Sequence, residues 1–144
     1  MTGPPFFAAI AEYLNGTNQL AIQGVDYPAD ITGFLEGGSP IGVAVMCVAL
    51  LSFSLAVTDI LRAKLINHTF AACPNTPLLL SGYSQGAQLV HQAAAALPAN
   101  TTAKISSVVL FGDPKNGTAI QGIAADKVLT ICHTGMLAPL KYPE

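Results

Sequence analysis

The residues at 82–86 indicate nucleophilic chemistry at a serine. They read Gly-Tyr-Ser-Gln-Gly, a G-x-S-x-G pattern that lies between an apolar run at 78–83 and a helix-forming run at 85–97. A serine on a tight strand-to-helix turn projects its hydroxyl from the carboxyl edge of a sheet, and the flanking glycines leave room for neighbouring chain segments. We expect Ser84 to be the nucleophile. We expect the backbone N–H of Gln85, at the helix start, to stabilise an oxyanion.

A serine nucleophile needs a general base and an acid that orients it. The chain order Ser, Asp or Glu, His is satisfied literally by Ser84, Asp113 and His133. Each assignment has an alternative, because Asp113 also suits a turn and His133 an exposed loop. His91 lies on the helix after the serine, where we expect it to pack or to face solvent. For the serine itself the alternative is a glycine-rich turn with a capping hydroxyl.

The elements that must position these residues follow an alternating order. Expected helices cover residues 6–14, 41–72 and 85–97, expected strands cover 19–25, 78–83, 105–111 and 128–132, and a loop is expected at 32–40. Strands that alternate with helices predict an α/β fold with a mainly parallel central sheet. We see no internal repeat and no domain linker, so a single domain over 1–144 is expected.

The composition excludes several function classes. Hydrophobic residues make up 51% of the chain and charged residues 10%, with a formal net charge of −2. A disordered chain needs low hydrophobicity and high charge. The six Lys and Arg residues form no basic patch, which argues against a nucleic-acid partner. The three cysteines form no C-x-x-C pair, so we expect no metal site.

One segment is long and apolar enough to suggest a membrane helix. Residues 37–58 carry no charge, but glycine and proline occupy the start and Ser52 and Ser54 fall in the middle. A membrane-anchored or ligand-binding module therefore stays an alternative, although we do not expect a membrane partner. The N-terminus has no basic region typical of a signal peptide. Four N-x-S/T sequons weakly favour a secreted origin, at Asn15, Asn67, Asn100 and Asn116.

Four motifs together resemble the fungal cutinases, a group that includes acetylxylan esterases. They are QGVDYPAD at 23–30, GYSQGA at 82–87, LFGDPK at 110–115 and ICHTG at 131–135. The resemblance implies a three-layer α/β-hydrolase-like fold with a central parallel sheet, in a secreted monomer that uses no cofactor and no metal. It implies that Ser84 is the nucleophile and that the Gln85 N–H is one oxyanion donor. Implied substrates are cutin polymer, short-chain esters or acetylated polysaccharide.

The sequence departs from the family pattern at both ends, so the resemblance implies an incomplete fold. The first strand of the family and its second oxyanion donor would precede Gly3, and the triad Asp would follow Gly135, where Met136 stands. By this mapping neither Asp113 nor His133 belongs to the triad. The alternative function is therefore a catalytically inactive homologue, truncated or mis-spliced, with an unpaired sheet edge.

The family pattern is also interrupted at residues 47–62. Removing this segment restores the family spacing, and possible codons at its ends are compatible with intron boundaries. Compatible codons also occur at 135–136, so we hypothesise that 47–62 and the tail 136–144 are translated introns. Cys73 and Cys132 match half-cystines of the family whose partners are absent here. The resemblance implies a disulfide-bonded glycoprotein, with these two bridges broken in this chain.

Overall fold

The computed structural model of the chain describes residues 3–16, 20–46 and 65–133. Four helices come first, α1 (Gly3–Tyr13), α2 (Ile31–Leu35), α3 (Pro40–Met46) and α4 (Leu65–Ala72). They are followed by β1 (Leu79–Tyr83), α5 (Gln85–Ala96), α6 (Ala99–Thr102), β2 (Ser107–Phe111), the short 3-10 helix η2 (Ala125–Lys127) and β3 (Val128–Ile131). The proposed insert 47–62 and the tail 136–144 lie outside the described residues, so neither prediction is tested.

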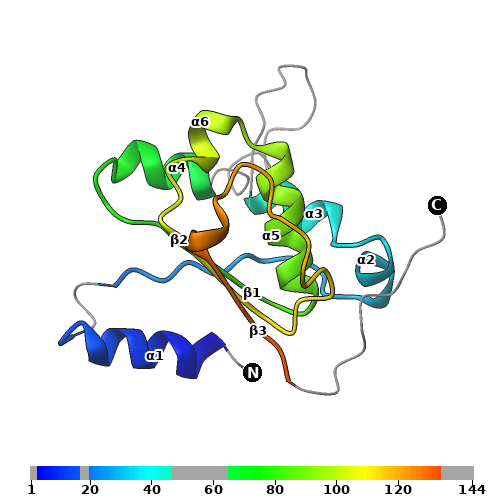
Figure 1. Ribbon diagram of the computed structural model, residues 1–144, viewed down its shortest axis with the longest axis horizontal. Coiled ribbons are helices and arrows are strands. Elements are labelled where there is room, and N and C mark those ends of the chain that lie inside the picture. Colours follow the sequence, from blue (N-terminus) through cyan, green and yellow to red (C-terminus); the bar gives the residue numbers. More distant parts are fainter. Residues whose placement is uncertain (1–2, 17–19, 47–64, 134–144) are drawn as a thin grey trace.

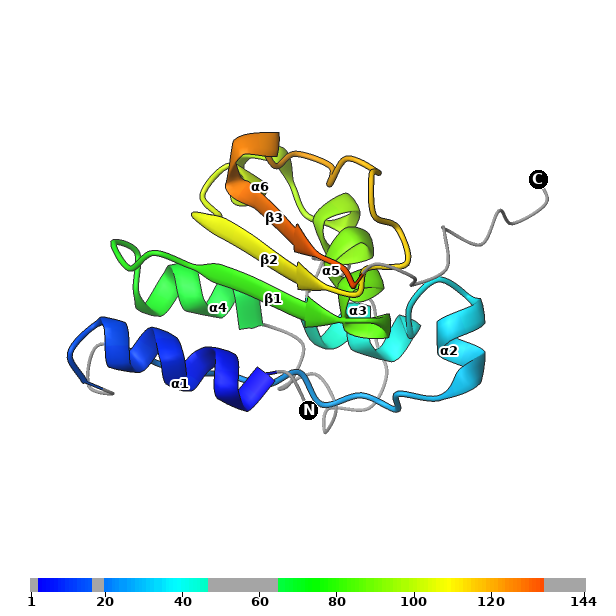
Figure 2. The same cartoon turned by 60° about the horizontal axis from the view of Figure 1, so that its bottom comes forward.

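The described sheet is parallel, as the alternation of strands and helices predicts. Its strand order is β1-β2-β3, and Leu79 pairs with Ser107 while Val108 pairs with Val128. Helix α1 lies on one side of this sheet, and α5, α3 and α4 lie on the other (Figures 1 and 2). The fold is thus three-layered, with the carboxyl ends of all three strands at one edge.

The core lies between the sheet and α5. Val108 and Leu110 of the central strand are fully buried, as are Leu89 and Val90 of the helix. Small alanines on α5 let the helix backbone approach β1 closely, which explains the alanine-rich sequence of this segment. On the opposite face, the ring of Phe6 meets that of Phe111 edge-on at 5.1 Å and attaches α1 to β2.

Two predictions about the chain before residue 40 are wrong. Residues 20–30 form no strand, although a strand was expected at 19–25, because no other strand pairs with them among the described residues. The loop expected at 32–40 contains α2 instead. Its helical turn is stabilised by the Asp30 carboxylate, whose Oδ1 accepts a 2.7 Å hydrogen bond from Gly33 N. That capping interaction was not recognised in the sequence.

The helices expected at 6–14 and 85–97 are confirmed as α1 and α5. The outcome differs for the long uncharged segment 37–58, which suggested a membrane helix. Within the described part of the chain no helix is long and apolar enough to cross a membrane. Most of the uncharged segment 37–58 falls outside the described residues, so the structure tests only its beginning, which forms α3.

Candidate active site

Ser84 occupies a strained turn between a strand and a helix. β1 ends at Tyr83 and α5 begins at Gln85, so Ser84 alone forms the connection. Its backbone has φ 52° and ψ −115°, a conformation that residues with a Cβ rarely adopt. Such a conformation persists only where the surrounding structure holds it, and it is typical of functional turns. The geometry places the Ser84 side chain at the carboxyl edge of the sheet.

The glycines that flank the serine have unequal roles. A Cβ on Gly82 would overlap the carbonyl oxygen of Gly86 and would come within 2.6 Å of Ala87 N. The turn therefore closes only because residue 82 lacks a side chain, as expected. A Cβ on Gly86 would meet the Tyr27 hydroxyl at 3.8 Å, an ordinary contact. The expectation that both glycines leave room for neighbouring segments is thus confirmed for Gly82, whereas a side chain at Gly86 would fit.

The start of α5 offers backbone donors beside the serine. Ser84 O accepts hydrogen bonds from Ala87 N at 2.9 Å and from Gln88 N at 3.4 Å. The amide of Gln85 is the first in the helix and belongs to the N–H groups that lack a carbonyl in the preceding turn. Together with the positive end of the helix dipole, this amide can bind a negatively charged oxygen.

Three glutamines of α5 anchor the segment that contains α2. Gln85 Nε2 donates to the carbonyl of Asp30 at 3.0 Å, and Gln92 Nε2 donates to that of Gly37 at 2.9 Å. Between them, Gln88 Nε2 lies 3.3 Å from the carbonyl of Phe34. The glutamines recur at helical spacing, so the three amides face the same neighbour. This row of glutamines holds the α2 segment against α5. The turn formed by residues 82–86, which carries Ser84 between β1 and α5, is called the elbow below.

Asp113, the acid of the triad that the chain order suggests, is hydrogen-bonded to residues other than His133. Asp113 Oδ2 lies 2.9 Å from His91 Nε2, and its Oδ1 accepts a 2.8 Å hydrogen bond from Lys115 N. The His91 and Asp113 side chains are 6% and 2% exposed. The structure therefore pairs Asp113 with a buried histidine of α5. His91 packs in the interior, which is one of the two placements expected for it, and its partner Asp113 is not foreshadowed by any local pattern in the sequence.

The remaining sequence candidates lie at the surface. His133 follows β3 at the carboxyl edge of the sheet and is exposed. Cys73 and Cys132 are exposed free thiols, so no disulfide joins the described cysteines, and Cys47 lies outside the described residues. Among the described residues no group of His, Cys, Asp or Glu side chains could hold a metal ion.

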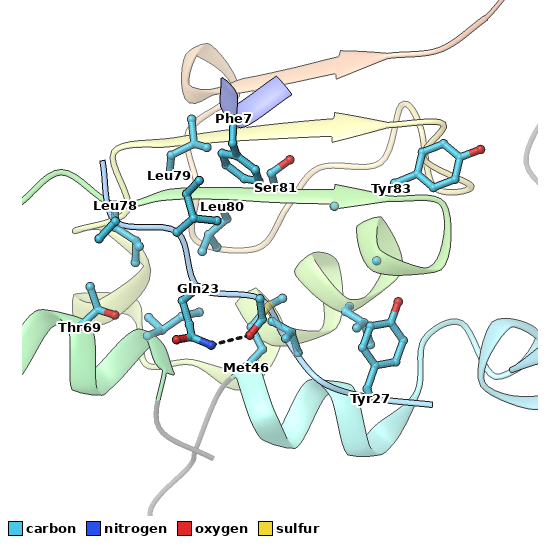
Figure 3. Close-up of a pocket in the computed structure, with 18 residues that line it drawn as sticks. Phe7, Gln23, Tyr27, Met46, Thr69, Leu78, Leu79, Leu80, Ser81 and Tyr83 are labelled. Atoms are coloured by element: carbon cyan, nitrogen blue, oxygen red, sulfur yellow. Dashed lines mark hydrogen bonds between the residues drawn. The ribbon is translucent and has the colours of Figure 1, made fainter. Parts of the chain in front are cut away.

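An apolar cavity of about 460 Å³ runs beside β1. Phe7 enters it from α1 and Met46 from α3, and Leu80 lines it from the strand (Figure 3). The Tyr27 hydroxyl reaches toward Gly86 at its elbow end, and burial raises the pKa of Tyr27. The cavity follows the edge of β1 that pairs with no described strand.

Comparison with known proteins identifies the same family that the motifs resemble. A family model described as Cutinase matches residues 1–137. A cutinase of Botryotinia fuckeliana is 49% identical over 135 residues, and one of Monilinia fructicola is 46% identical over 133 residues. These matches cover 94% and 92% of this chain but only 58% and 57% of the two relatives. The chain thus spans less than two thirds of the length of these curated relatives.

A solved structure supports the fold in the same way. The chain superimposes with a TM-score of 0.73 and 40% identity on a Trichoderma reesei cutinase in complex with a C11Y4 phosphonate inhibitor. That match covers 92% of this chain and 52% of the other. The three-layer fold around a parallel sheet, predicted from the sequence, is therefore confirmed over the described residues.

Proposed function

The chain belongs to the cutinase family, and on that premise we propose that it is a serine esterase that forms an acyl-enzyme at Ser84. The observation that carries the proposal is the backbone of Ser84, held at φ 52° on the turn between β1 and α5. A turn of this kind exposes the hydroxyl at the carboxyl edge of the sheet and places a helix N-terminus beside it. The flanking Gly82 supports it, because a side chain there would open the turn.

The proposed reaction has two steps. In the first, the Ser84 oxygen attacks the ester carbonyl carbon, the C–O bond to the alcohol breaks, and the hydroxyl proton leaves on the alcohol. The Gln85 N–H donates a hydrogen bond to the oxyanion that forms meanwhile. In the second step, water attacks the acyl group on Ser84, releases the carboxylic acid and restores the hydroxyl. Both steps need a general base, and His133 at the same edge of the sheet is a candidate.

The proposed substrates are carboxylic esters, namely cutin polymer, short-chain soluble esters or acetylated polysaccharide. We further propose that the protein acts outside the cell as a monomer and uses no cofactor. The four sequons and the membership in the cutinase family support the extracellular proposal. We propose neither a nucleic-acid partner nor a membrane partner for the protein.

One observation favours a second candidate, a cutinase homologue without catalytic activity. Asp113 is hydrogen-bonded to His91, so this carboxylate is not free to orient His133. Loss of a triad member typically lowers the rate by several orders of magnitude and leaves residual catalysis only. Under this candidate Ser84 would keep its strained turn but would not form an acyl-enzyme.

Hydrolysis of a short-chain p-nitrophenyl ester by the purified protein and by Ser84→Ala separates the two candidates. The esterase proposal expects a burst of p-nitrophenol equal to the enzyme concentration and an acyl mass on the Ser84 peptide. Equal rates for the two proteins would establish the inactive candidate. His133→Ala tests the base, because loss of a general base typically costs about 10²- to 10⁴-fold in rate. Cutin, tributyrin and acetylated xylan then compare the three substrate classes.

A further inference from the structure

We propose that the buried pair of His91 and Asp113 positions the serine elbow, a role that rests on the proposed esterase function. His91 lies on α5, and Asp113 follows the carboxyl end of β2. Their side chains meet with His91 Nε2 2.9 Å from Asp113 Oδ2. Both residues belong to the buried polar side chains of the described core, most of whose members are apolar.

The pair closes a ring of contacts around Ser84. Ser84 N donates a 2.9 Å hydrogen bond to the carbonyl of Phe111, the last residue of β2. Asp113 is only two residues further along the chain, and its Oδ2 contacts His91. His91 in turn lies seven residues after Ser84, which is about two helical turns and therefore on nearly the same side of α5. The chain after β2 is thus attached to the elbow at one point and to the elbow's helix at another.

The ring matters because Ser84 is strained. A non-glycine residue at positive φ is sterically unfavourable and relaxes unless its neighbours prevent it. The hydrogen bond to Phe111 is one restraint, and Phe111 is paired with Tyr83 and Ile131 where β2 passes into the turn that contains Asp113. Asp113 Oδ2 joins this turn to α5 through His91, and Oδ1 orders the turn itself by accepting from Lys115 N at 2.8 Å. Without the His91 contact, this restraint on Ser84 is weakened.

The burial of the pair makes it sensitive to the loss of one partner. With side chains 6% and 2% exposed, water cannot replace the missing hydrogen bond easily. A buried polar group left without its partner costs far more than the net value of the bond. The pair contacts no reacting atom, so His91 and Asp113 are positioning residues and not catalytic residues.

Amide exchange of Ser84 measures the effect directly and requires no activity. In His91→Met, exchange at the Ser84 amide is expected to speed up about tenfold or more relative to the Val109 amide of β2. In His91→Gln, whose side-chain amide can still donate to Asp113, the exchange rate is expected to return toward that of the parent. Thr102→Val is the matched control, because it removes a buried hydroxyl that donates to Ala99 O within α6, beyond the end of α5 that is far from Ser84. It is expected to change both amides equally.

Kinetics add a readout that general destabilisation would not change. At a temperature where all variants are folded, His91→Met is expected to lower kcat per folded molecule about 10- to 100-fold with little change in KM, while Thr102→Val leaves both unchanged. Equal acceleration of the Ser84 and Val109 amides in His91→Met would overturn the proposal, as would failure of His91→Gln to restore them. If the parent has no esterase activity, the proposed function fails, and the exchange data still decide the positioning role.

Discussion

The side-chain amide of Gln85 donates a 3.0 Å hydrogen bond to the carbonyl of Asp30, a residue 55 positions earlier in the chain. Gln85 is thereby fixed on both sides, by its place in the elbow and by the segment that leads into α2. A Cβ on Gly33 would lie 2.7 Å from Gln85 Nε2, so the first turn of α2 sits directly against this amide. Gln85, whose backbone N–H is the proposed oxyanion donor, therefore also binds the segment around Asp30 and Gly33 through its side chain.

Replacing Gln85 by Glu is expected to lower the free energy of unfolding by about 1–3 kcal/mol. The new carboxylate would face the Asp30 carbonyl, an acceptor, in a site where Gln85 is 7% exposed. Urea unfolding measures the change, and the exposed Gln121→Glu provides the control. Equal stability of the two variants would show that the hydrogen bond to Asp30 contributes nothing.

Substitutions at the two elbow glycines are expected to differ sharply. Gly82→Ala places a methyl group against the backbone of Gly86, which cannot move without opening the turn, so a loss of about 3 kcal/mol or more is expected. Gly86→Ala meets only an ordinary contact and lies in α5, where alanine is favoured over glycine by up to about 1 kcal/mol. Thermal unfolding compares the two, and a similar loss in both would contradict the assigned roles.

Ser84→Gly is expected to stabilise the protein while it removes the proposed nucleophile. Glycine adopts positive φ without the steric cost that serine bears at φ 52°, so a gain of about 1 kcal/mol is expected. Ser84→Ala removes the hydroxyl but keeps the Cβ, and is therefore the control that should gain less. Urea unfolding of both variants is the measurement. A stability of Ser84→Gly at or below that of Ser84→Ala would argue against stored strain.

The central strand is expected to dominate stability. Leu110 is fully buried between α5 and the sheet, so Leu110→Ala should cost about 2–5 kcal/mol. Leu129 on β3 is 56% exposed, and its replacement by alanine should cost much less. Denaturant unfolding of this pair tests the position of the core. Similar losses for the two variants would place the core elsewhere.

Local pattern was sufficient to predict the elbow and the elements on either side of it. An apolar run before 82–86 and an alanine-rich run after it favour strand and helix without help from distant residues, and the structure has β1 and α5 there. The α/β fold with a parallel sheet followed from the same alternation, and its three layers were implied by the resemblance to the cutinases. These predictions succeeded because spacing along the chain alone determines which face of an element is apolar.

Only the tertiary structure decided which side chains meet. Asp113 and His91 are 22 residues apart, and their contact depends on how the turn after β2 packs on α5, which no local pattern encodes. For the same reason the acid that appeared free to serve a triad is buried with another histidine. Residues 20–30 illustrate the reverse, because a strand-like sequence forms no strand without a neighbour to share its hydrogen bonds. Sequence alone thus determined the turn at Ser84 with β1 and α5 on either side of it, and packing between distant segments determined whether residues 20–30 form a strand and which partners the polar groups have.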